Sequence, residues 1–371
     1  MNHDDTVYAC ALNRIFAYSC AKGKALAERF PSPGEIFSLG RGGLEDIFGK
    51  GSPFVEKISD KSILDKAEGD VAWAGKMGIP IIYIGDREYP GRLRECPDAP
   101  IVLFYKGTAG LNPEHAISVV GTRRPTAYGL RICREIIKEL SCTEPAPLII
   151  SGLAYGIDIT AHIAAMENGV GTLGVMATGL DCIYPHLHRE YAARMAGCGG
   201  LVTDFPPGSR PLPVNFLKRN RIIAGISDGV IVIESNIKGG SMITAGLASS
   251  YSRPVYAVPG KIGDHLSAGC NELIRQNIAE IIACPGDIVG QIGWKKSESP
   301  VDQNKTRTPE NYDSIKRNIL LALSSRSVQD TDSLVMASGA DRKTALRKLA
   351  EMEIEGTVIF DSYGNYMLKD I

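Results

Sequence analysis

Two basic stretches of the sequence contain residue types that bind phosphate groups. VVGTRRPTAYG (119–129) places Arg123 and Arg124 just after an apolar run and a glycine, before a helix that begins near Thr126 or Ala127. Guanidinium groups at such a turn suit a phosphate or a base, although many surface arginines are simply solvated. The second stretch, NFLKRNRIIAG (215–225), contains Lys218, Arg219, Asn220 and Arg221.

The second stretch has the pattern of a helix start that leads into a buried strand. The amino terminus of a helix carries partial positive charge, so each cation in its first turn is unfavourable by roughly 0.3–1 kcal/mol. We therefore expect a polyanion to balance Lys218, Arg219 and Arg221.

Two further stretches are rich in small residues, which let backbone N–H groups face an anion. In ISGLAYGIDITAHIAA (150–165) a tight turn is an equally good interpretation, and Asp158 and His162, one helical turn apart, could pair. The small and hydroxyl residues expected at the anion are Ser151, Gly152 and Gly156 in this stretch, and Gly239, Gly240, Ser241 and Thr244 in KGGSMITAG (238–246).

Patterns of catalytic residues do not stand out in the sequence. It has no Walker A motif, no serine nucleophile in a recognisable turn and no evident pair of carboxylates. Asp181, His186 and His188 lie close together, but without a further ligand at metal-binding spacing. We therefore expect a binding protein that is not an enzyme, with no metal and no cofactor.

Short apolar segments alternate with amphipathic ones from about residue 110 onward, after one earlier segment at 79–85. This alternation predicts an α/β fold with an extended Rossmann-like parallel sheet covered on both faces. Ligands of such sheets bind beyond the carboxyl ends of the strands, where the basic and small residues fall. The later strands are predicted at 116–121, 147–152, 172–179, 200–205, 229–235, 254–260 and 280–284.

The sequence predicts three domains. Residues 1–75 form a small helical N-terminal domain of the SAM or helix-hairpin-helix kind, and 76–292 form the Rossmann-like domain. A polar linker, 293–311, leads to a C-terminal winged-helix domain, 312–371, in which Asp341 caps the third helix. That helix carries basic residues that either contact DNA or form a solvated face: Arg342, Lys343, Arg347 and Lys348.

The composition limits the kind of ligand surface. The chain has 371 residues and a formal net charge of −1, so any nucleic-acid surface must be a local patch. Its nine cysteines show no C-x-x-C spacing, which favours a reduced, cytoplasmic protein. No apolar run reaches roughly 18 residues, so we expect no membrane segment.

Seven motifs, in order, make the chain resemble the DNA-processing protein A family, also called DprA or Smf. They are VGTRRPTAYG, SGLAYGIDITAHIAA, ATGLDCIYP, RNRIIAGISDGVIVIES, GGSMITAGLA, PVYAVPG and GCNELI. The resemblance implies a homodimer that binds single-stranded DNA, protects incoming DNA in natural transformation and recombination, and promotes loading of the RecA recombinase. Arg123 matches the family's Gly-Ser-Arg motif, and Lys218, Arg219 and Arg221 match its F-P-x-R-N-R segment, where they would hold phosphates and bases.

Four positions depart from the family pattern without removing the expectation of DNA binding: Thr122, His188, Asp204 and Leu217. Two other functions stay open. A nucleotide phosphoribohydrolase-like Rossmann enzyme would use a glycine-rich turn like that at 238–241, although the Gly-Thr and catalytic Glu of those enzymes are missing here. A regulator of duplex DNA would act through the winged helix.

Overall fold

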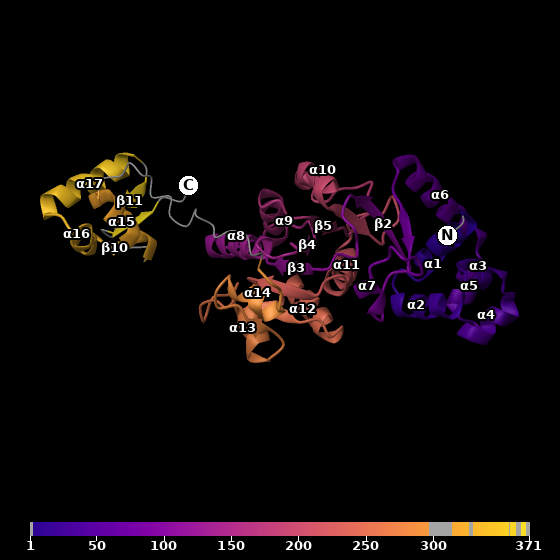
Figure 1. Ribbon diagram of the computed structural model, residues 1–371. Coiled ribbons are helices and arrows are strands. Elements are labelled where there is room, and N and C mark those ends of the chain that lie inside the picture. Colours follow the sequence, from indigo (N-terminus) through magenta and orange to yellow (C-terminus); the bar gives the residue numbers. More distant parts are fainter. Residues whose placement is uncertain (1–2, 297–313, 326–328, 356, 361–364, 369–371) are drawn as a thin grey trace. The chain divides into compact units, whose positions relative to one another are not determined.

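The computed structural model describes residues 3–296, 314–325, 329–355, 357–360 and 365–368. The chain forms two compact units, Met1–Ser297 and Glu298–Ile371 (Figure 1). Each unit has its own hydrophobic core, so we describe them separately.

The chain begins with six helices, which confirms the predicted helical segment. Serine or aspartate side chains at Ser32, Ser52 and Asp60 cap three of them, and prolines stand in the first turn of two. Their core residues, such as Leu12 and Phe16, belong to the same buried cluster as Val202 in the sheet. The helices are α1 (His3–Ile15), α2 (Cys20–Arg29), α3 (Pro33–Ser38), α4 (Arg41–Phe48), α5 (Pro53–Ser59) and α6 (Lys61–Met77).

Nine strands of the larger unit form one sheet in the order β1-β2-β6-β5-β4-β3-β7-β8-β9. Neighbours from β6 to β9 are parallel, whereas β2 is antiparallel to both β1 and β6. All eight predicted strands are confirmed, but β2 is not among them, and the sheet is parallel only from β6 onward. The strands are β1 (Ile81–Tyr83), β2 (Val102–Gly107), β3 (Ala116–Gly121), β4 (Leu148–Ser151), β5 (Thr172–Val175), β6 (Gly200–Thr203), β7 (Gly229–Ile233), β8 (Val255–Ala257) and β9 (Glu280–Ile281).

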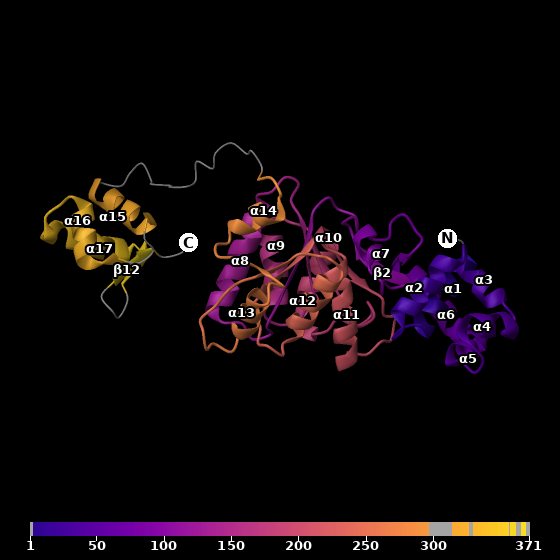
Figure 2. The ribbon, with the colours of Figure 1, turned by 90° about the horizontal axis from the view of Figure 1, so that it is seen from below.

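Helices cover both faces of this sheet, as the α/β prediction requires (Figures 1 and 2). One face carries α8 (Ala127–Ser141), α9 (Ile157–Glu167) and α10 (Arg189–Cys198), which follows a short 3-10 turn, η1 (His186–His188). The opposite face carries α7 (Gly91–Glu95), α11 (Pro213–Gly225), α12 (Gly240–Ser250) and α13 (Ala268–Arg275). The central strands β3, β4, β5 and β7 are almost entirely buried between these two layers.

The larger unit extends beyond the predicted domain end at residue 292. Helix α14 (Asp287–Ile292) packs on α8, and the Trp294 ring stacks on His115 with 4.3 Å between centroids. Lys296 forms an ion pair with Glu139 at 2.8 Å. Residues 293–296 therefore belong to this unit, and the rest of the predicted linker lies outside the described residues.

The described residues of the smaller unit form three helices and a three-stranded sheet in the order β10-β12-β11. The Asp341 side chain accepts hydrogen bonds from the N–H groups of Lys343 and Thr344, both at 3.1 Å, which confirms the predicted cap. The element order agrees with a winged helix, and that assignment stays a prediction. The elements are α15 (Ser314–Ser325), β10 (Gln329–Asp330), α16 (Thr331–Ser338), α17 (Arg342–Ile354), β11 (Val358–Phe360) and β12 (Asn365–Leu368).

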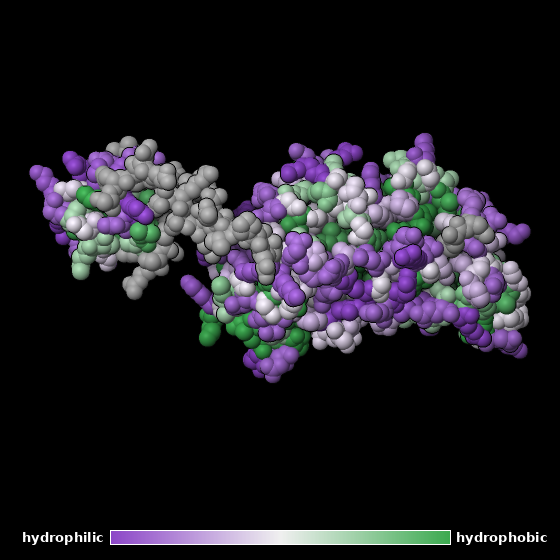
Figure 3. Space-filling view, in the orientation of Figure 1, coloured by the Kyte–Doolittle hydropathy of each residue, from purple (hydrophilic) through white to green (hydrophobic). Residues whose placement is uncertain are grey.

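Figure 3 shows one face of the larger unit, coloured by hydropathy. Hydrophilic residues cover much of this face, and hydrophobic side chains gather near α13. Ile262, in the turn before α13, is fully exposed. Within the described parts of the chain, no helix is both long and apolar enough to cross a membrane.

Candidate functional site

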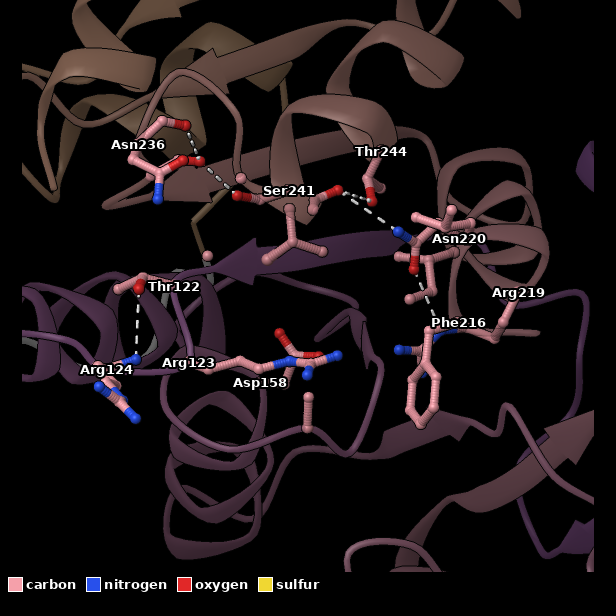
Figure 4. Close-up of a pocket in the computed structure, with 18 of the residues that line it drawn as sticks. Thr122, Arg123, Arg124, Asp158, Phe216, Arg219, Asn220, Asn236, Ser241 and Thr244 are labelled. Carbon is pink, nitrogen blue, oxygen red and sulfur yellow. Dashed lines mark hydrogen bonds between the residues drawn. The ribbon is translucent and has the colours of Figure 1, made fainter. Parts of the chain in front are cut away.

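A pocket of about 410 Å³ opens beyond the carboxyl ends of β3 and β7 (Figure 4). Its walls come from the turn after β3, from α11 and from the start of α12. The chain moves outward from β3 in both directions along the sheet, first to β4 and later to β7, and such a switch point is where open α/β sheets bind ligands. The charged residues that line the pocket are Arg123, Arg124, Arg219 and Asp158, so its charge is positive.

The turn that carries Arg123 is fixed by Glu234, the residue after β7. The Glu234 carboxylate accepts hydrogen bonds from the N–H of Thr126, at 2.8 Å, and from its hydroxyl. The Thr126 hydroxyl in turn caps α8 by accepting a hydrogen bond from the N–H of Gly129 at 3.1 Å, and the helix begins at Ala127, where its start was predicted. The exposed Arg123 side chain points into the pocket, and its guanidinium lies 5.4 Å from the Phe216 ring centroid (Figure 4). An exposed cation is thus presented from a turn that hydrogen bonds hold in place.

Arg219 lies at the floor of the pocket and is held by the ends of two strands. One of its Nη atoms donates to the carbonyl of Gly152 at 2.5 Å and to the carbonyl of Val175. A Cβ at position 152 would lie 2.4 Å from this guanidinium, so any larger residue there would displace Arg219 from its present position. Burial lowers the pKa of Arg219 to about 10, and the side chain therefore stays positively charged at neutral pH.

Asp158, in the first turn of α9, supplies the negative charge in the pocket. Burial raises the pKa of this carboxyl, while the charge of Arg219 opposes the rise. A carboxylate repels phosphate but accepts hydrogen bonds from amino and imino groups of a base. The pocket thus combines cations for phosphates with an acceptor for a base edge.

The start of α12 forms the wall opposite Arg123. The Ser241 hydroxyl donates to the Ser235 hydroxyl at 2.7 Å, and the Asn220 side-chain amide donates to the Gly240 carbonyl at 3.4 Å. The predicted neighbourhood of α11 and this glycine-rich turn is confirmed. The predicted residues that line the pocket are Arg123, Arg124, Arg219, Asn220, Gly239, Gly240, Ser241 and Thr244.

The prediction that Lys218, Arg219 and Arg221 start a helix is wrong. The prediction that all three face this pocket is wrong for Lys218 and Arg221, which do not line it. Helix α11 begins at Pro213, so Lys218 is its sixth residue and lies beyond the first turn. Lys218 and Arg221 both form ion pairs with the buried Asp204, at 2.8 and 2.5 Å. The anion that balances these two cations is a carboxylate of the protein itself.

Asp204 and its two partners connect α11 to the N-terminal helices. The Asn13 side chain of α1 donates to the Asp204 carbonyl at 2.8 Å, and the Lys218 ammonium lies 5.6 Å from the Tyr18 ring centroid. Burial alone would raise the pKa of Asp204, but Lys218 and Arg221 lower it below its ordinary value. The carboxylate therefore stays charged at neutral pH.

Ser151, Gly152 and Gly156 also lie outside the walls of this pocket. The Ser151 hydroxyl donates to the Val119 carbonyl at 2.6 Å, and the Gly152 carbonyl accepts a hydrogen bond from the Arg219 guanidinium. Gly156 has a φ of 78°, which favours glycine, and lines an adjoining hollow. Their predicted contacts with DNA stay a prediction.

Two arrangements considered from the sequence, an Asp158–His162 pair and a metal site near Asp181 and His188, do not form. His162 contacts the Thr172 hydroxyl at 2.7 Å instead of Asp158, and burial lowers the pKa of His162 to about 3. His188 donates to the Leu153 carbonyl at 2.9 Å, and Asp181 accepts from the N–H of Gly208 at 2.9 Å. Among the described residues, no group of three or more His, Cys, Asp or Glu side chains could hold a metal ion.

Phe216 and Asn236 line the pocket but were not predicted as site residues. Phe216 had a signal in the sequence, because it stands three and four residues before Arg219 and Asn220 and thus on the same helical face. Asn236 is three residues beyond the end of β7 and has no comparable spacing signal.

An open Rossmann-like sheet with a cationic, partly aromatic pocket at its switch point defines the class of anion-binding α/β proteins. The chain belongs to the DNA recombination-mediator protein A family, whose family model matches residues 80–293. The resemblance to DprA and Smf proteins is thereby confirmed.

Relatives match both the sequence and the fold. The putative DNA processing protein DprA of Mycobacterium tuberculosis is 32% identical over 370 residues, covering 95% of this chain and 92% of the relative. The X-ray structure of DprA from Streptococcus pneumoniae is 33% identical with a TM-score of 0.65, covering 80% of this chain and 99% of that one. DNA processing protein A from Helicobacter pylori, described for its single-stranded DNA binding mode, is 27% identical with a TM-score of 0.52 and covers 58% and 95%.

Proposed function

We propose that this protein binds single-stranded DNA in the pocket beyond β3 and β7, and acts in DNA recombination and transformation. The observation that carries the proposal is the exposed Arg123 guanidinium beside Phe216 at the mouth of a cationic pocket. Arginine can neutralise a phosphate and an aromatic ring can stack on a base, and this combination is the usual basis of single-strand recognition.

The pocket favours binding over catalysis. Its lining contains one carboxylate, Asp158, and neither histidine nor cysteine, so it has no pair of groups for acid and base catalysis. We therefore propose a binding protein that needs no cofactor. The glycine-rich turn at 238–241 supplies the Ser241 hydroxyl and a helix start, without a catalytic Glu.

Membership of the family supports three further proposals. We infer that the bound strand is protected and passed to a RecA recombinase, that the protein acts as a homodimer, and that it works in the cytoplasm. All nine cysteines are free in the structure, which suits a reducing compartment.

The salt dependence of binding tests the phosphate contacts. If Arg123 and Arg124 each neutralise one phosphate, log K for oligo-dT should fall with log salt with a slope of about −1.4, since each single-strand contact contributes about −0.7. Fluorescence anisotropy at several salt concentrations measures this slope. An affinity that does not change with salt would contradict phosphate binding in the pocket.

The alternative of a duplex regulator is tested by removing the smaller unit. Because residues 298–371 form a separate compact unit, a chain ending at 297 should fold and keep its affinity for oligo-dT within about threefold. Electrophoretic mobility shifts with single-stranded and duplex DNA measure both affinities. If the folded truncated chain binds no single strand, the principal DNA site lies in the smaller unit.

A further inference from the structure

A second hollow, of about 560 Å³, adjoins the first pocket and shares Arg123 and Arg124 with it. Figure 4 shows that the two arginines diverge, with Arg123 pointing into the first pocket and Arg124 away from it. The Arg124 guanidinium makes no hydrogen bond or ion pair with another described residue, so it is available to a ligand. None of the residues that line the second hollow carries a negative charge.

The second hollow also contains an aromatic ring that is held in place but open to water. Tyr155, between β4 and α9, is 43% exposed, and its ring stands edge to face against His188 with 4.9 Å between centroids. His188 is itself buried and fixed by its hydrogen bond to the Leu153 carbonyl at 2.9 Å. A large ring that is rigid and half exposed loses little entropy when a ligand stacks on it.

The floor beside Tyr155 is apolar, formed by Pro125, Leu130 and Ile159. The hollow therefore joins three features: a free cation at one side, an aromatic ring and an apolar floor. A nucleotide needs this combination, since its phosphate is anionic while its sugar and base have apolar faces. Both hollows also fall within the range of roughly 300–1,000 Å³ that is usual for ligand sites.

We propose that the second hollow binds the next nucleotides of the same DNA strand, with a base stacked on Tyr155 and a phosphate at Arg124. This inference rests on the proposed function, because the first pocket must hold the neighbouring part of the strand. Arg123 and Arg124 form the ridge that the strand crosses between the two hollows.

The test compares two lengths of fluorescent oligo-dT, of about 4 and about 16 nucleotides, which bracket usual single-strand site sizes. With the full chain, Tyr155→Ala should weaken binding of the longer oligonucleotide roughly tenfold, the effect of one lost base stack. It should leave the shorter one, which the first pocket can hold alone, within about twofold. Tyr155→Phe, which keeps the ring, should behave like the unmodified protein.

Tyr128 offers a matched control. It is 41% exposed on α8 and lines neither hollow, so Tyr128→Ala should leave the affinity for both lengths unchanged. Arg124→Ala is a second variant that does not depend on the packing around Tyr155. It should weaken binding of the longer strand and reduce the salt slope by about 0.7.

The outcomes separate the two proposals. If Tyr155→Ala and Arg124→Ala both fold, as judged by unchanged melting, and both bind the longer strand like the unmodified protein, the second hollow is not part of the site. Equal weakening of both lengths by Tyr155→Ala would also overturn it, because Tyr155 would then act on the first pocket. If the unmodified protein binds neither length, the proposed function fails together with this inference.

Discussion

Arg123→Glu is expected to weaken the binding of single-stranded DNA by about 30- to 1,000-fold, or about 2–4 kcal/mol. The substitution replaces the cation at the mouth of the pocket with an anion, which would repel the phosphates of a strand bound there. The fold should survive, because Arg123 is exposed and surface substitutions usually alter stability by less than about 0.5 kcal/mol. Anisotropy with oligo-dT, beside a melting curve of the same sample, measures both quantities.

Arg131→Glu is the matched control for this experiment. Arg131 is an exposed arginine on α8 that lines neither hollow, and it pairs weakly with Glu135 at 3.5 Å. Both variants change the net charge equally, so any general electrostatic effect on DNA should be the same. If the folded Arg123→Glu protein binds as tightly as Arg131→Glu, the pocket beyond β3 is not the DNA site.

Asp204→Ala is expected to destabilise the larger unit by about 3–5 kcal/mol, because it leaves Lys218 and Arg221 buried without their counter-ion. Urea unfolding, followed by circular dichroism, measures the change. Since the folded state lowers the pKa of Asp204, its contribution should be present above about pH 4 and be lost as the pH falls below that value. The pH dependence should be weaker in the variant.

Two controls separate stability from DNA contact. Glu272→Ala removes a surface ion pair with Arg275 and should leave the free energy of unfolding nearly unchanged. Lys218→Met keeps the apolar stem beside Phe205 and Tyr18 and should leave DNA affinity unchanged in the folded protein. A loss of affinity in Lys218→Met would support the direct DNA contact that the sequence predicted for Lys218. If the Asp204→Ala protein is as stable as Glu272→Ala, the ion pairs of Asp204 with Lys218 and Arg221 have no structural role.

The strand ends could be predicted from the sequence because each central strand is a continuous apolar run that ends at a glycine or a polar turn. Parallel pairing then places those ends at one edge of the sheet, which is why Arg123 and the turn before α12 were correctly expected near each other. The pattern contains no such rule for β2, because this strand pairs antiparallel with β6, which lies far away in the sequence.

The roles of the basic residues in α11 depended on where the helix begins. Pro213 is a signal for the first helical turn, and starting the helix there moves Lys218 beyond that turn. The partner of Lys218 and Arg221 could not be found from the sequence, because Asp204 follows a different strand and has no spacing relation to them. Contacts between distant segments are set by the packed fold and not by local pattern.

Helix α11 presents two different environments on adjacent residues. Phe216, Arg219 and Asn220 line the pocket, while Lys218 and Arg221 pair with Asp204 toward the N-terminal helices. On the proposed function, alanine at Phe216 or Asn220 is expected to weaken DNA binding, whereas alanine at Lys218 or Arg221 is expected to destabilise the fold. For substitutions between residues 216 and 221, loss of function in the cell does not reveal whether DNA binding or folding has failed. The amount of folded protein in the cell separates these two causes.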